Sequence, residues 1–279
     1  MLKRTLCALL AALMLTAIFC ASQAEQADLA SAMMAYLDCP STYFPPAEDD
    51  AAILRAWEDA CIRGEEEGFV PVLVAVDDVL WQMLQMNSDE SPVYGSYEFN
   101  AGNAAQYRAE MLAQPLRDGK EVLDELTDLL RDELESYGFD WEADVVGEMG
   151  GGEASDQLMG HRDLLSGKTM PLILAEIPVD NPWEVFAYLP FGGWNYCPDT
   201  PELMAAAKHW YEQYGAVPAV VTGSTLEFVL PAPASDEQAM DLALEQSGFC
   251  PDLLLMGEMT AGMLADSLRQ STVWFFWWD

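Results

Sequence analysis

Two cysteines and one histidine in the C-terminal third are the residue types best suited to covalent or metal chemistry. The chain has two histidines, His161 and His209, and Cys197 and Cys250 each precede a proline. A cysteine becomes a nucleophile when a neighbouring base takes its proton, so Cys197 with His209 would form a hydrolase-like pair. A structural zinc needs about four ligands, and neither C-x-x-C spacing nor an evident fourth ligand is present. We predict no metal site, and core packing or a disulfide is the favoured role of these cysteines.

Carboxylates are the second kind of candidate. Glycosidase-type hydrolysis uses two of them, but with 47 Asp and Glu residues no single pair stands out. The sequence lacks the G-x-S-x-G elbow, the Walker loop and a G-x-G-x-x-G after a strand. We therefore predict no catalytic residue and no cofactor. The alternative is a hydrolase-like enzyme that uses a carboxylate pair, or Cys197 with His209.

The segment from Asn181 to Pro198 is dense in aromatic residues and glycine. Aromatic rings beside a Gly-Gly backbone and a few polar groups suit a ligand-binding cleft. The predicted cleft residues are Trp183, Phe191, Gly192, Gly193, Trp194, Asn195, Cys197 and Asp199. The alternative is that these aromatic side chains only cover the end of a sheet.

The charge of the chain restricts its partners. Twelve Lys and Arg oppose 47 Asp and Glu, which gives a formal net charge of −35. Such a field repels phosphate backbones and anionic lipids, so we predict no nucleic-acid partner. The partner is not identified by the sequence, and the classes that this charge suits are a basic protein or peptide and a divalent cation. Alternatively, the charge only keeps an exported protein soluble.

Residues 1–24 have the features of a signal peptide. Lys3 and Arg4 precede an apolar run over residues 6–19, and Ala21-Ser22-Gln23-Ala24 supplies the small residues of a cleavage site. We predict cleavage after Ala24, export by the general secretory route to the cell envelope or the medium, and no later membrane span. An uncleaved anchor and lipidation at Cys20 are the alternatives.

Export would allow the cysteines to form disulfides. Four of the six would remain after cleavage, and proximity in sequence suggests the disulfides Cys39–Cys61 and Cys197–Cys250. Four cysteines allow three pairings, and buried free thiols are the competing interpretation.

Hydrophobic periodicity predicts the elements that position these residues. Helical spacing dominates the first half, which we assign as a helix-rich region over residues 25–146, and Phe69 to Val76 is its one clear strand. Residues 147–168 contain a Gly-rich run and are predicted to be a flexible connection. Residues 169–279 form the C-terminal module. Its strands are predicted over residues 172–177, 217–222, 225–230 and 273–278, with pairs of helices between the first and second and between the third and fourth.

Local signals also place single residues on these elements. Asp118, Thr200 and Thr260 are the predicted starts of three helices. His209 lies at the edge of the apolar stripe of the helix that follows Thr200. Glu227 lies on the face of its strand opposite Leu226, so this strand is predicted to be half-buried.

The last strand carries a specific expectation. Alternation puts Trp274, Phe276 and Trp278 on one face and Phe275 and Trp277 on the other. Both faces are apolar, so we expect the N-terminal half or a partner to cover the second face.

A combination of short motifs carries a family resemblance. The motifs are Phe191-Gly192-Gly193-Trp194-Asn195 with Cys197-Pro198, Trp210-Tyr211-Glu212, Leu226-Glu227-Phe228, Phe249-Cys250-Pro251-Asp252, and the ending from Val273 to Asp279. Together they resemble domain-of-unknown-function family 4253 over about residues 171–279. The resemblance implies no activity and no site residues. It implies an intracellular bacterial protein, from which the signal peptide is a departure.

These observations predict an α+β fold. The N-terminal half is helix-rich with one strand, and the C-terminal module is a small mixed β-sheet packed with helices in the order β-α-α-β-β-α-α-β. The most favoured function is an exported, acidic, non-catalytic binding or protein-interaction module.

Overall fold

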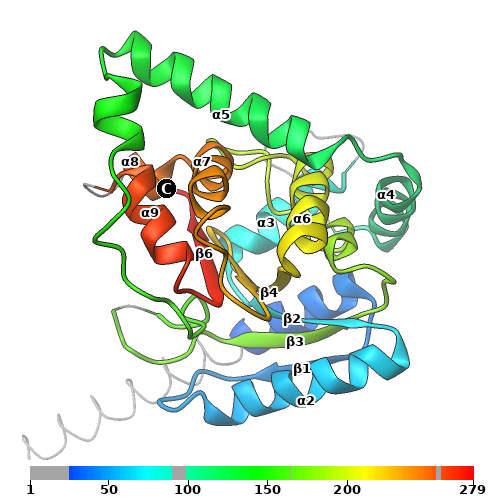
Figure 1. Cartoon of the computed structure of the whole chain (residues 1–279). Helices are drawn as coiled ribbons and strands as arrows, with labels where there is room; N and C mark the ends of the chain where they lie inside the picture. The colour runs from blue at the N-terminus through cyan, green and yellow to red at the C-terminus, as the bar shows by residue number, and fades with distance from the viewer. Residues whose placement is uncertain (1–24, 90–98, 164, 256–258) are drawn as a thin grey trace, which may run out of the picture.

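A six-stranded mixed sheet is the centre of the molecule (Figure 1). The computed structural model describes residues 25–89, 99–163, 165–255 and 259–279, so the predicted signal peptide lies outside the described residues. The strands lie in the order β1-β3-β2-β4-β5-β6. Their bounds are β1 Ser41–Phe44, β2 Val70–Ala75, β3 Leu172–Ile177, β4 Val217–Val221, β5 Thr225–Val229 and β6 Val273–Trp277.

The position of β2 joins the two halves of the chain. This strand pairs antiparallel with β3 and parallel with β4, so a strand from the N-terminal half lies between two strands of the C-terminal module. All six residues of β2 are buried, as the continuous apolar run predicts. The two halves therefore share one sheet.

Helices and helical turns connect the strands, and the predicted α+β fold class is confirmed. A helix that includes residues 25–37 precedes β1. The others are α2 Ala51–Glu67, α3 Asp78–Asn87, α4 Ala101–Ala113, α5 Gly119–Ser136, the π-helical turn η1 Trp141–Val146, the 3₁₀ turn η2 Pro182–Ala187, α6 Thr200–Tyr214, α7 Ala239–Phe249, α8 Asp252–Leu255 and α9 Ala261–Leu268.

The four predicted strands of the C-terminal module are confirmed to within one residue at their ends. Residues 222–224, which include Gly223 and Ser224, join β4 to β5. The prediction of one strand in the N-terminal half was incomplete, because β1 pairs with β3 at the sheet edge. This strand has only four residues and lies among prolines, so its sequence lacks a periodic signal.

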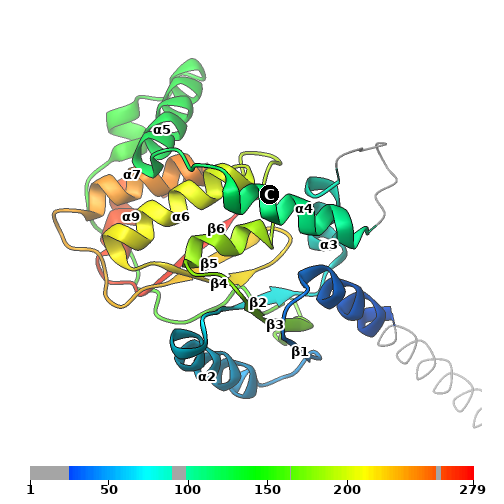
Figure 2. The same ribbon diagram turned by 90° about the vertical axis from the view of Figure 1, so that its right-hand side faces the viewer.

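The first face of the sheet is covered by most of the helices, including α6, α7 and α9 (Figure 2). Trp210 of α6 is the centre of an aromatic cluster there. Its ring stacks on Phe276 of β6, with centroids 5.5 Å apart, and meets Phe249 of α7 edge-on at 4.8 Å. Trp274 of β6 and Trp278, which directly follows the strand, are buried on the same face. The predicted alternation of the last strand is correct on this side.

The second face is covered by α2 and by the connecting segment, residues 147–168. Helix α2 packs Ile53 and Ala60 against it (Figure 2). The connecting segment crosses the edge at β6, where the Ser155 carbonyl accepts hydrogen bonds from the amides of Thr272 and Val273 at 3.0 and 3.1 Å. The segment predicted as a flexible connection is therefore hydrogen-bonded to the sheet.

The cover of the second face is incomplete at β6. Phe275 remains 42% exposed, so the expectation that both apolar faces of the last strand are covered was wrong for this residue. Strand β6 is an edge strand, and the hydrogen bonds of Ser155 hold the connecting segment at the start of this strand, at Thr272 and Val273.

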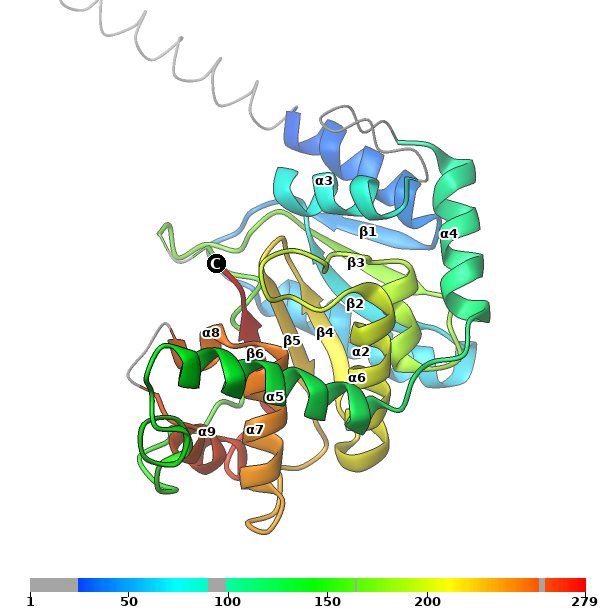
Figure 3. The ribbon, with the colours of Figure 1, turned by 90° about the horizontal axis from the view of Figure 1, so that it is seen from above.

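Helix α5 lies outside this layer of helices (Figure 3). It crosses α6 and α7, and Asp118 caps it by accepting a hydrogen bond from the Glu121 amide at 3.1 Å, as predicted. Its outer end packs Leu130 and Leu134 against Trp141 of η1 in a separate small cluster.

Candidate functional site

The predicted aromatic cleft residues have structural partners. Phe191 is fully buried, and Trp194 donates its indole N–H to the Phe191 carbonyl at 2.9 Å. The side-chain amide of Asn87 donates to the carbonyls of Pro190 and Gly192 at 2.6 and 2.9 Å. A Cβ at Gly192 would lie 1.9 Å from the Pro198 carbonyl oxygen, so the turn needs glycine.

The remaining cleft candidates are dispersed. Asn195 adopts a left-handed conformation with φ 42° and donates to the Asp279 carbonyl. Asp199 is the N-cap of α6, one residue before the predicted Thr200. Trp183 packs on Tyr211, with ring centroids 5.5 Å apart, and Gly193 is exposed at φ 82°. None of the cavities described below is lined by these residues.

All four cysteines of the described residues are free thiols, so neither predicted disulfide is present in the structure. Cys39 packs beside the core of the first face, whereas Cys61 is on α2 over the second, and the sheet separates them. Cys250 donates its thiol to the Trp277 carbonyl at 3.1 Å, and burial raises its pKa to about 12.

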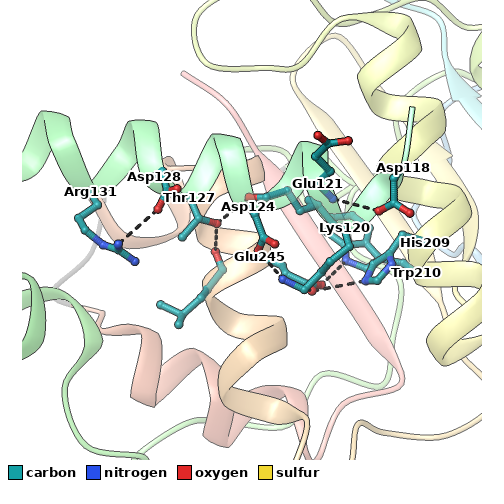
Figure 4. Close-up of polar contacts among 12 residues, drawn as sticks. Asp118, Lys120, Glu121, Asp124, Thr127, Asp128, Arg131, His209, Trp210 and Glu245 are labelled. Carbon is teal, nitrogen blue, oxygen red and sulfur yellow. Dashed lines mark hydrogen bonds and ion pairs between the residues drawn. The ribbon is translucent and has the colours of Figure 1, made fainter. Parts of the chain in front are cut away.

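Cys197 is an unsuitable nucleophile. Burial, followed by the neighbouring Cys250, raises the pKa of its thiol well above the ordinary value. A nucleophilic cysteine needs the opposite shift, toward thiolate. The contact of His209 in the structure is a carboxylate and not this thiol (Figure 4).

That carboxylate belongs to Glu245, a residue of α7 that is almost completely buried. The Trp210 indole N–H donates to its Oε2 at 3.0 Å, and His209 Nε2 lies 3.4 Å from Oε1. Lys120 Nζ lies 3.8 Å from the same oxygen and also contacts Asp124 (Figure 4). The cluster therefore joins three helices, α5, α6 and α7, through one buried carboxylate.

The packing around this cluster is close. A Cβ at Gly119, the first residue of α5, would lie 2.2 Å from the Ala205 carbonyl and 2.6 Å from the His209 Cβ. The arrangement is typical of a structural clamp, since a buried carboxylate needs several donors to offset its desolvation. Sequence reasoning placed His209 at the edge of the apolar stripe but did not identify Glu245, which comes from another helix.

The second histidine anchors the connecting segment. His161 is fully buried, with Nε2 2.8 Å from Asp50 Oδ2, and Arg162 donates to the same oxygen at 2.6 Å. Burial lowers the pKa of His161 although the Asp50 carboxylate opposes this shift. The contact holds the segment to the N-terminus of α2.

Glu227 of β5 is a buried carboxylate that the sequence assigned to the polar face of a half-buried strand. It accepts hydrogen bonds from the amides of Met159 and Gly160, at 2.8 and 2.9 Å, and is 1% exposed. Burial raises its pKa to about 7, although the two amide donors oppose the shift. Strand periodicity placed it opposite Leu226 and Phe228 correctly, but only the connecting segment makes that position buried.

An acid-lined cavity of about 520 Å³ lies at the carboxyl end of β2. Its floor is apolar and includes Leu29, Val76 and Met170. Among the described residues, its carboxylates are Glu25, Asp77, Asp78 and Asp163, and its lysine, Lys168, is paired with Glu48 at 2.8 Å.

Asp77 shapes the wall of this cavity. It accepts hydrogen bonds from the Leu80 amide at 2.7 Å and from the Gly223 amide at 3.1 Å, which ties the start of α3 to the β4–β5 turn. Burial raises its pKa. Asp78 is exposed, and the half-buried Asp163 accepts a hydrogen bond from the Ser166 amide at 2.6 Å.

Two further properties concern the described residues only. In the four described ranges, no group of three or more His, Cys, Asp or Glu is arranged to hold a metal ion. Within the same ranges, no helix combines the length and apolarity needed to span a bilayer.

The C-terminal module carries the family match that its motifs predict. Residues 173–279 match the family described as Domain of unknown function (DUF4253). No curated protein and no solved structure matches the chain. The matched range excludes β2, the strand that separates β3 from β4.

Proposed function

We propose that the protein is an exported, non-catalytic binding module whose acid-lined cavity receives basic side chains of a protein or peptide partner. The observation that carries this proposal is the cavity of about 520 Å³ at the end of β2, whose described lining includes the carboxylates of Asp77, Asp78 and Asp163 and a lysine already paired with Glu48. A concave site with an apolar floor and a few charged groups is the usual form of a ligand site.

The charge of the whole chain supports the same partner class. A net charge of −35 attracts cations from a distance, and a cavity with a mainly acidic lining concentrates that attraction. The apolar floor suits the methylene groups of a lysine or arginine side chain, whose charged end then meets the carboxylates.

Calorimetric titration at low salt with acetyl-Lys-Lys-amide and with uncharged acetyl-Gln-Gln-amide tests the proposal. We expect binding of the lysine peptide only. The double substitution Asp78→Asn/Asp163→Asn should weaken it about 10-fold, since each exposed ion pair contributes up to about 1 kcal/mol.

A matched control separates the cavity from the general field. Glu58→Gln/Glu66→Gln removes the same two charges from exposed positions of α2, on the second face of the sheet. It should leave the affinity within about twofold, because screening limits distant charges. Equal losses in the two double variants, or equal binding of the two peptides, would refute the proposal.

A further inference from the structure

A second cavity, of about 460 Å³, lies at the opposite end of the sheet. It is bounded by the C-terminal part of α2, the first residues of β2 and β4, and the start of η2. Trp57, Phe69 and Tyr211 supply aromatic walls, and Val179 and Val217 are among its apolar residues. It shares no lining residue with the acid-lined cavity.

The walls of this aromatic cavity are held in place. Trp57 donates its indole N–H to the Pro71 carbonyl at 3.3 Å, and Tyr211 packs against Trp183. Gly64 lets α2 approach Phe69, because a Cβ there would lie 2.4 Å from the Phe69 carbonyl oxygen. The cavity is therefore formed by ordered secondary structure, and a ligand can bind in it with little rearrangement of the protein.

The charged groups of the lining are acidic. Glu65 and Asp180 are exposed at its rim, and no Lys or Arg is among its described lining residues. The guanidinium of Arg63 lies 5.2 Å from the Phe69 ring centroid, but it is bound to Glu67 and Glu176. The lining thiol, Cys61, has its pKa raised to about 11 by burial and by Glu58 and Glu65, so it is neutral at pH 7.

We propose that the aromatic cavity binds a small amphipathic ammonium compound, with its apolar group between the aromatic walls and its ammonium group toward Glu65 and Asp180. Aromatic faces attract cations, and nearby carboxylates add to that attraction. The same two carboxylates repel an organic anion. A neutral compound of the same shape makes the apolar contacts but has no charge for the carboxylates to attract. This site is independent of the basic-peptide site, since the two cavities lie at opposite ends of β2.

Three indole compounds that differ in charge test the proposal. Calorimetry or NMR titration of the full chain should give tighter binding of tryptamine, a cation, than of neutral tryptophol, by about 10-fold. Anionic indole-3-acetate should bind least. Equal affinity for the three, or undetectable tryptamine binding at millimolar concentration, would overturn the proposal.

Substitutions of residues that line the aromatic cavity test whether the ligand binds there. Glu65→Gln should weaken tryptamine binding at least about fivefold and leave tryptophol unchanged, because only the cation loses a partner. Glu66→Gln is the matched control. It removes the same charge from the adjacent exposed residue, which does not line the cavity. Val217→Trp should block both compounds by filling the cavity.

The acid-lined cavity provides the last control. Asp78→Asn/Asp163→Asn should leave tryptamine binding intact, whether or not that cavity binds a basic peptide. Loss of tryptamine binding in this double variant, or equal effects of Glu65→Gln and Glu66→Gln, would place the ligand elsewhere and refute the inference.

Discussion

Replacing Glu227 by glutamine should remove a pH-dependent part of the free energy of unfolding. The Glu227 carboxylate is 1% exposed, and its hydrogen-bond donors in the structure are the amides of Met159 and Gly160. Its cross-strand neighbours are Val220 and Phe275, which offer no charge. Burial therefore disfavours the ionised form more than the two amides favour it, and its pKa rises from 4.5 to about 7.

The direction of the effect follows from proton linkage. Between pH 4.5 and about 7 the folded protein binds a proton that the unfolded chain has released, so stability falls as the pH rises through this range. The rise of the Glu227 pKa from 4.5 to about 7 corresponds to a loss of about 3 kcal/mol in the free energy of unfolding. The whole loss of stability is present above pH 7, and none of it is present below pH 4.5.

Urea unfolding from pH 5 to pH 8 measures this contribution. The wild-type curve also contains the repulsion of a chain with net charge −35, so the informative quantity is the wild-type stability minus that of Glu227→Gln. Glutamine cannot accept both amide hydrogen bonds, which lowers stability by about 1–3 kcal/mol at every pH. The difference between the two proteins should therefore shrink by about 3 kcal/mol from pH 5 to pH 8.

The exposed Glu237→Gln variant is the control, because it removes one charge without touching the connecting segment. Its difference from the wild type should be nearly constant over the same range. Parallel pH curves for the wild type and Glu227→Gln would refute the assignment of a strongly raised pKa to this buried carboxylate.

Two more predictions concern the sheet and the clamp. The isolated segment of residues 169–279 should show no cooperative unfolding by circular dichroism, because β3 and β4 pair with β2 and not with each other; a cooperative transition would contradict this. Glu245→Ala should lower the free energy of unfolding by about 2–4 kcal/mol in urea, since the Trp210 N–H loses its charged acceptor in a buried site. Asp124→Ala should cost less than about 1 kcal/mol, because that residue only forms an exposed pair with Lys120, and equal losses would argue against the clamp.

The fold was predictable wherever local signals agreed. Asp118 and Thr260 were assigned as helix caps from side-chain chemistry alone, and both accept the expected amide hydrogen bonds. The candidate site was less predictable. His209 of α6 contacts Glu245 of α7. The spacing of these two residues along the chain does not indicate that contact. Cys197 and Cys250, which the sequence suggested as a disulfide pair, are buried neighbours in the structure, and both are free thiols.

The sequence by itself determined most of the secondary structure, the family resemblance of the C-terminal module and the apolar character of the last strand. These depend on local periodicity, on capping side chains and on short motifs. Only the tertiary structure decided that β2 separates β3 from β4, that residues 147–168 bury Glu227, and that cavities lie at both ends of β2. The physical reason is that burial and pairing depend on residues distant in the chain: Glu227 is polar-facing in its own strand and becomes buried only when Met159 and Gly160 cover it.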